Sequence, residues 1–164
     1  MPSKSKIKGS TYERDIARYL TETYGQTFVR VPTSGAYVGG SNAHRASTLD
    51  RHQLAAHKGD IQPPSGWQIN IEVKNYASIP WHQMINQECK QLDTWIDQLE
   101  QVSAPADIDI IFFKISRQGQ FVCVRHHPCF DLTQSLQYNE YFVYNLDQFF
   151  AKNKETLKRL CTNW

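Results

Sequence analysis

Residues 67–74 read Trp-Gln-Ile-Asn-Ile-Glu-Val-Lys, and their strict alternation of apolar and polar side chains predicts a β-strand. With a side-chain period of two, Ile69 and Val73 lie on one face, and the opposite face carries Glu72 and Lys74. A half-buried strand whose polar face lies in water shows the same alternation. The stretch therefore predicts a strand and leaves open whether its charged face is solvated or functional.

Asp60 lies shortly before this strand, separated from it by a Pro-Pro-Ser-Gly turn at residues 63–66. If the chain at Asp60 pairs antiparallel with the strand, Asp60 shares a face with Glu72 when it lies opposite an even-numbered residue. Asp60, Glu72 and Lys74 can then meet. Two carboxylates beside an ammonium group are typical of a Mg²⁺ site, at which a bound water becomes a nucleophile for a phosphodiester.

The composition predicts one folded domain. A chain of 164 residues with 40% hydrophobic content is long enough for one compact domain, residues 1–164, and too short for two. No apolar run could span a bilayer and no signal peptide is evident, so we expect a soluble cytoplasmic protein. The four cysteines lack paired close spacing and are expected to be reduced and buried.

The first predicted helix carries a carboxylate on its apolar face. Ser10 and Glu13 match an S-x-x-E capping box, which predicts a helix over residues 10–24. Capping alone would explain Glu13. However, Glu13 shares its helical face with Ile16 and Leu20, which must pack inward, and a buried carboxylate needs a partner such as a metal.

A strand is predicted over residues 26–31, ended by Pro32. Arg30 is the unusual residue of this strand. It is either a solvated arginine at the sheet edge or a bidentate donor that faces the scissile phosphate.

Three motifs together resemble a known family. They are Lys8-Gly9-Ser10-Thr11-Tyr12-Glu13-Arg14, Phe28-Val29-Arg30-Val31-Pro32-Thr33-Ser34-Gly35, and Asp60 with Glu72-Val73-Lys74. In order and character they resemble the archaeal-type Holliday junction resolvases and their phage relatives, members of the PD-(D/E)xK (restriction-endonuclease-like) nuclease superfamily. The resemblance covers roughly the first half of the chain.

This resemblance implies an α/β fold, with a mixed central β-sheet flanked by helices. It also implies that Glu13, Asp60 and Glu72 bind the metal, Mg²⁺ with Mn²⁺ as a possible substitute. Lys74 would be catalytic, and Arg30 and Ser34 would contribute to the active site. Such resolvases act as homodimers, and each subunit nicks one strand of a four-way DNA junction. The chain departs from the motif at Gly59, where the motif's name has proline, and we expect this change to be minor.

Basic residues near the candidate site predict contacts with DNA. Residues 1–60 carry a net charge of +4 and the remainder a net charge of −2, although so small a charge also suits many neutral enzymes. We interpret residues 1–8 as a basic arm and residues 36–58 as a flexible loop that contacts DNA. The histidines of that loop lack the regular spacing of a zinc site. The candidate DNA-binding residues are Lys4, Lys6, Lys8, Arg14, Arg45, Arg51 and Lys58.

The second half of the chain completes a mixed sheet with helices against it. One long amphipathic helix is predicted over residues 80–102, and its early polar residues Gln87, Glu88 and Lys90 could approach the site. The remaining expectations are a hairpin of strands at 107–116 and 120–125, a strand at 141–144, and a final helix capped by Asn145.

The sequence leaves three functions open. The first is a metal-dependent, structure-selective DNA endonuclease, and within that class a Holliday junction resolvase. The second keeps the chemistry but cuts ordinary duplex, as a nicking or restriction-like endonuclease. The third is a non-catalytic DNA-binding module whose charged strand face is only solvated.

Overall fold

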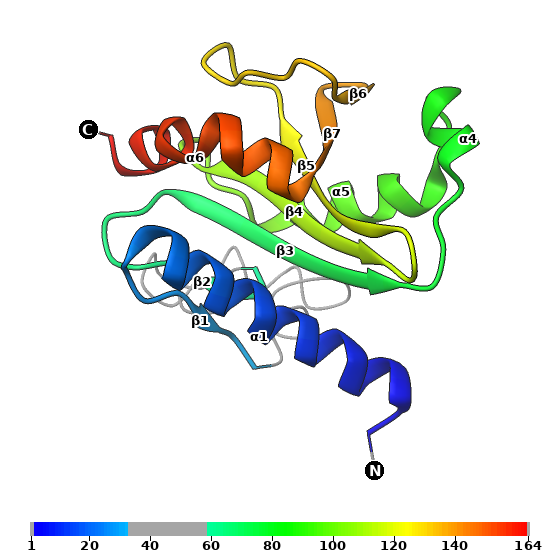
Figure 1. The fold of residues 1–164 in the computed structure, drawn as a ribbon, viewed down its shortest axis with the longest axis horizontal. Helices are drawn as coiled ribbons and strands as arrows, with labels where there is room; N and C mark the ends of the chain where they lie inside the picture. The colour runs from blue at the N-terminus through cyan, green and yellow to red at the C-terminus, as the bar shows by residue number, and fades with distance from the viewer. Residues whose placement is uncertain (1, 33–58, 164) are drawn as a thin grey trace.

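The computed structural model describes residues 2–32 and 59–163 and is built on a five-stranded mixed sheet (Figure 1). The sheet order is β3-β4-β5-β7-β6; β3 and β4 run parallel and the remaining pairs are antiparallel. The strands are β3 (Ile69–Tyr76), β4 (Ile108–Ile115), β5 (Gly119–Arg125), β6 (Leu136–Tyr138) and β7 (Tyr141–Asn145). The predicted mixed α/β architecture is confirmed.

Helices cover both faces of the sheet. One face packs against α1 (Lys4–Tyr24) and α6 (Leu146–Thr162), and the other against α4 (Trp81–Ile85) and α5 (Lys90–Val102). The cap predicted for α6 is confirmed, because the Asn145 side chain accepts a hydrogen bond from the Gln148 backbone N–H.

Strand β3 confirms the strand predicted around Ile71. It also excludes one of the two interpretations that the sequence left open, a polar face exposed to water. Ile71 and Val73 are buried in the core beneath α1 and α6. The polar face is not solvated, because Asn70 is only 1% exposed and Glu72 only 8%. Burying charged side chains costs free energy unless they are paired or bind a metal. The partners of Glu72 and its neighbours on this face therefore need to be identified.

Helix α1 begins earlier than predicted. Ser3 is its N-cap, accepting a hydrogen bond from the backbone N–H of Lys6 at 3.3 Å. Ser10 lies inside the helix and donates its hydroxyl to the carbonyl of Ile7 at 3.1 Å. The capping box at Ser10 and the separate basic arm were therefore wrong, because residues from Lys4 onward continue the helix.

The helix predicted over residues 80–102 is broken into α4 and α5. Gln87 interrupts it with a φ of 61°, and its side-chain amide donates to the carbonyl of Gln137 at 2.8 Å. The backbone N–H of Cys89 donates to the Tyr138 hydroxyl at 2.9 Å. These contacts with β6, a strand that was not predicted, replace the hydrogen bonds of a continuous helix.

A small antiparallel ribbon lies beside α1 and β3. It consists of β1 (Val29–Arg30) and β2 (Ile61–Gln62), with Arg30 opposite Ile61. The antiparallel pairing with β3 that was considered as a condition for the segment at Asp60 does not form as a ladder, because β2 pairs with β1 instead.

Two further findings concern the helices and the cysteines. In the part of the chain that the structure describes, no helix has both the length and the apolar character needed to cross a membrane. All four cysteines are free thiols; Cys89, Cys123 and Cys161 are buried as expected, whereas Cys129 is exposed.

Candidate active site

The candidate site forms at the outer edge of β3, the first strand of the sheet. Asp60 attaches to this edge twice. Its backbone N–H donates to the carbonyl of Ile71 at 2.8 Å, and its carboxylate Oδ2 accepts from the backbone N–H of Val73 at 2.7 Å. These two bonds flank Glu72, so they place Asp60 beside it without a regular ladder.

Gly59 makes this attachment possible. Its φ is +64°, and a Cβ at this position would lie 2.5 Å from the carbonyl oxygen of Ile71. Proline cannot adopt this conformation, because its ring fixes φ near −65°. The backbone at this position therefore requires glycine. The expectation that this departure from the motif is minor for the family resemblance stays a prediction.

Lys74 is held between two acceptors. Its Nζ donates to Glu72 Oε1 at 2.8 Å and to Gln98 Oε1 at 2.7 Å. The Glu72 and Lys74 side chains are only 11% and 14% exposed. The predicted meeting of Glu72 and Lys74 is therefore present, with a third partner from α5.

Gln98 contacts the candidate site, and the sequence did not indicate it. It lies late in α5, whereas the polar residues considered were Gln87, Glu88 and Lys90 near the break that precedes this helix. Gln98 directly precedes the buried Leu99. Several polar residues of α5 lie next to its buried apolar residues. Only the observed packing of α5 against β3 shows that Gln98 is the one that reaches Lys74.

Glu13 has the partner that its position on the inner face of α1 required. Arg30 Nε donates a hydrogen bond to Glu13 Oε2, and the two side chains are 24% and 17% exposed, respectively. Arg30 is thus neither a solvated edge arginine nor unpaired. It links β1 to α1 next to Asp60, whose carbonyl accepts from the backbone N–H of Val31 at 2.9 Å.

The three carboxylates influence one another electrostatically. Burial raises the pKa of Glu72 to about 7; the negative charge of Asp60 adds to this effect and Lys74 opposes it. Burial also raises the pKa of Glu13, while the hydrogen bond from Arg30 lowers it and the charge of Asp60 raises it. Asp60 thus acts on both glutamates, and the cluster holds more negative charge than its surroundings readily accommodate.

The cluster has donors of the right kind for a divalent cation. Carboxylate oxygens are the ligands that Mg²⁺ and Mn²⁺ prefer, and a cation would offset the negative charge that burial, and to a lesser extent the neighbouring carboxylates, make costly here. Within residues 2–32 and 59–163, however, no three His, Cys, Asp or Glu side chains are arranged as a ready metal site. Glu13 instead contacts Arg30, and Glu72 contacts Lys74.

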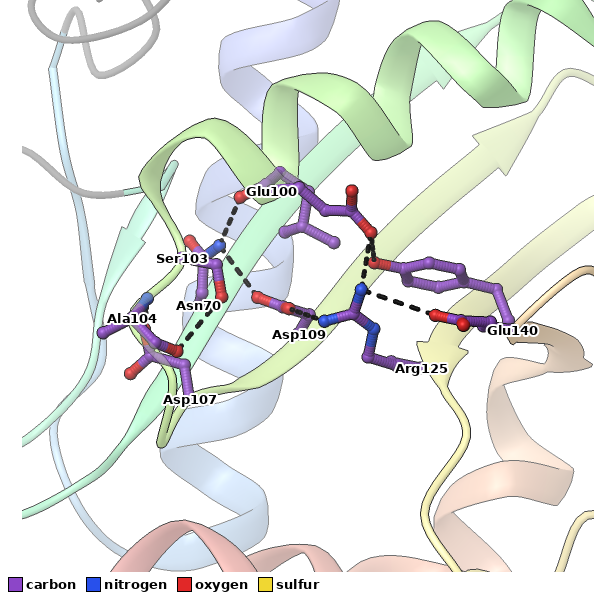
Figure 2. Close-up of polar contacts among 10 residues, drawn as sticks. Asn70, Glu100, Ser103, Ala104, Asp107, Asp109, Arg125 and Glu140 are labelled. Carbon is purple, nitrogen blue, oxygen red and sulfur yellow. Dashed lines mark hydrogen bonds and ion pairs between the residues drawn. The ribbon is translucent and has the colours of Figure 1, made fainter.

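A second polar network fastens α5 to β3, as Figure 2 shows. The Asn70 side-chain amide donates to the carbonyl of Leu99 at 2.8 Å and to Asp109 Oδ1 at 3.1 Å. Arg125 then pairs with Glu100 at 2.8 Å and with Asp109 at 3.7 Å. Because Leu99 follows Gln98 directly, this network holds the part of α5 that contacts Lys74.

The other predicted site residues divide into two groups. Lys4, Lys6, Lys8 and Arg14 are exposed along the first half of α1. Ser34, Arg45, Arg51 and Lys58, together with the predicted loop at 36–58, lie outside the described residues.

Comparison with known proteins identifies the family. No curated protein and no solved structure matches the chain. A family model described as "Phage putative PDDEXK endonuclease" matches residues 4–162, and the mixed sheet flanked by helices is consistent with the restriction-endonuclease-like fold. Members of this nuclease superfamily generally use divalent metals. With nearly its whole length matched, the chain belongs to this family of phage PDDEXK endonucleases.

Proposed function

We propose that this protein is a metal-dependent, structure-selective DNA endonuclease that hydrolyses phosphodiester bonds. The observation that carries the proposal is the burial of Glu72 beside Asp60 and Lys74 at the outer edge of β3. A surface that only binds DNA presents exposed cations to the phosphates. It has no use for buried carboxylates, which repel phosphate and cost free energy to bury.

The cofactor we propose is Mg²⁺, for which Mn²⁺ would substitute, held by Glu13, Asp60 and Glu72. This choice is supported by the oxygen donors and by the raised pKa values of the two glutamates. When bound, such a metal supplies an activated water and offsets negative charge on the phosphate.

The cationic side chains have complementary roles. An ammonium group has three N–H donors, and Lys74 directs two of them to Glu72 and Gln98, which leaves one for the attacking water or a phosphate oxygen. Arg30 contacts Glu13 through Nε, so its terminal nitrogens can offset charge that develops in the transition state. Ser34 is included as a contributing residue because of the family resemblance.

The substrate we propose is a four-way DNA junction cut by a homodimer, one strand for each subunit. The motifs at residues 8–14 and 28–35 support this choice through their resemblance to the junction resolvases. The residues proposed to contact the DNA backbone are Lys4, Lys6, Lys8, Arg14, Arg45, Arg51 and Lys58.

The test compares an end-labelled four-way junction with its matched linear duplex. Each is incubated with Mg²⁺, Mn²⁺, Ca²⁺ or a chelator, using wild-type protein, Glu72→Gln, and the control Glu140→Gln, whose side chain is 78% exposed. We expect paired symmetric nicks in the junction alone, with Mg²⁺ or Mn²⁺, from wild type and Glu140→Gln. Glu72→Gln should bind the junction and not cut it.

Each other outcome has a definite meaning. Equal cutting of the duplex would retain the site and replace the substrate with ordinary duplex. Cutting by a clean preparation of Glu72→Gln would remove Glu72 from the mechanism. Salt-sensitive binding with no cutting in any metal would identify a DNA-binding module instead.

A further inference from the structure

Three separate segments meet where β3 ends. The Nζ of Lys8, in α1, donates to Ser116 Oγ at 2.8 Å, and the Asn75 side chain donates to the Lys8 carbonyl at 3.2 Å. The backbone N–H of Ser116 donates to the carbonyl of Tyr76 at 3.0 Å. Figure 1 shows the start of α1, the arrowhead of β3 and the β4–β5 turn on the same side of the molecule.

These segments carry positive charge without compensating acids. Residues 2–12, 75–87 and 114–120 together contain five lysines or arginines and no aspartate or glutamate, although the whole chain has 16 acidic residues. We call Lys4, Lys6, Lys8, Tyr76 and Arg117 the β3-end surface. It wraps around the end of the strand, because the lysines come from α1 on one face of the sheet and Tyr76 lies on the face that α5 covers. A surface of one sign attracts a polyanion such as a nucleic-acid backbone.

Tyr76 adds an aromatic ring to this charged surface. The residue is 43% exposed, and its ring centroid lies 5.0 Å from that of Trp95, which supports it from within. It lies two positions after Lys74 on the same strand and shares its face, about 7 Å further along. Single exposed aromatic residues are common, but this one follows the proposed catalytic lysine and borders the basic segments of α1 and of the β4–β5 turn.

We propose that the β3-end surface binds an unpaired DNA strand, with a base stacked on Tyr76 and phosphates near Lys8 and Arg117. Aromatic rings beside basic residues are the combination that binds single-stranded nucleic acid, because every base offers a π-face. A base inside a duplex is covered by its neighbours, so only an unstacked base can reach the ring. The inference rests on the proposed nuclease function and adds a reason for its selectivity, namely unpaired nucleotides next to the cut.

The test measures binding without cleavage. Fluorescence anisotropy of a labelled oligo(dT) strand and of a hairpin duplex is recorded in chelator for wild type, Tyr76→Leu, Tyr76→Phe and Arg117→Gln. Lys154→Gln serves as the charge control, because Lys154 is exposed on α6 and its carbonyl accepts a hydrogen bond from Tyr24, at the opposite end of α1 from Lys4, Lys6 and Lys8. Thermal melting of every variant verifies that the fold is retained.

The expected results differ for each variant. Tyr76→Leu keeps an apolar contact with Trp95 and should weaken oligo(dT) binding about tenfold, within the range for loss of one base stack, while duplex affinity changes little. Tyr76→Phe should bind like wild type. Arg117→Gln should reduce the slope of log K against log salt by about 0.7, the value for one phosphate contact on a single strand. Lys154→Gln should change neither affinity nor slope.

Unchanged oligo(dT) affinity in Tyr76→Leu, or an equal loss for oligo(dT) and duplex, would overturn the inference. Junction cleavage by wild type separates this failure from failure of the proposed function. If wild type cuts the junction and Tyr76→Leu binds oligo(dT) normally, the proposed strand-binding role of the β3-end surface is refuted and the proposed nuclease function is retained. If Tyr76→Leu weakens oligo(dT) binding but wild type does not cut the junction, the strand-binding role of the β3-end surface is retained and the proposed nuclease function is refuted.

Discussion

Replacing Glu72 with glutamine is expected to stabilise the metal-free protein at neutral pH. Burial and the charge of Asp60 raise the pKa of Glu72 from an ordinary value of 4.5 to about 7. Because the folded state binds this proton more tightly than the unfolded state, ionising Glu72 costs stability. The cost is absent below pH 4.5, grows as the pH rises, and is complete above about pH 7.

The size of the effect follows from these two values. At about 1.4 kcal/mol for each pH unit between them, the full cost is about 3 kcal/mol. Glutamine removes the charge and keeps an Oε1 acceptor for Lys74, so the variant should escape this cost. For a chain of this size, 3 kcal/mol corresponds to a rise in Tm of about 6–12 °C.

The assay is urea unfolding followed by tryptophan fluorescence, in chelator, from pH 4 to pH 8. The free energy of unfolding of Glu72→Gln minus that of wild type should be near zero at pH 4 and largest at pH 8. Glu140→Gln, which alters a carboxylate whose side chain is 78% exposed, should show no such trend. A difference that does not change with pH, or a variant less stable than wild type at pH 8, would refute the reasoning.

Three further predictions concern backbone strain, lysine positioning and thiol exposure. Gly59→Ala should lower the free energy of unfolding by at least about 2 kcal/mol, measured by urea unfolding, because alanine is strained at a φ of +64° and its Cβ meets a carbonyl. Gln98→Ala should slow junction cleavage about tenfold with an unchanged Tm, since it removes an exposed residue that orients Lys74; equal rates would contradict this role. Cys129 should react with a thiol reagent in the native protein, whereas the three buried thiols should react only on unfolding, which peptide mapping after labelling can check.

The strands and the final helix were predictable because their signals are local. The alternation around Ile71 reflects the geometry of one strand, and the Asn145 cap depends on residues three positions apart. The start of α1 and the break at Gln87 depend on contacts with distant segments, among them Ser116 and Gln137. No local pattern contains that information.

Sequence spacing predicted which charged residues of the candidate site come together, but not how they contact one another. Glu72 and Lys74 meet because they are neighbours on one strand face, which a period of two fixes. Asp60 reaches them through a backbone turn that requires glycine, a route different from the antiparallel pairing that the sequence made conceivable. The contact between Gln98 and Lys74 depends on how α5 lies across the sheet. Sequence spacing does not contain this tertiary information.

The attachment of Asp60 to β3 has a consequence for handling the protein in solution. Asp60 occupies the N–H of Val73 and the carbonyl of Ile71, two groups through which an outermost strand could otherwise pair with a second copy of the chain. Asp60→Ala would therefore leave the Val73 N–H free to pair with another chain, in addition to removing a carboxylate. The resulting self-association would make any comparison of activity hard to interpret. Within residues 2–32 and 59–163, the Glu72 side chain bonds to Lys74 and not to the backbone of β3. Glu72→Gln is therefore the cleaner substitution with which to test the proposed nuclease site and to trap DNA complexes.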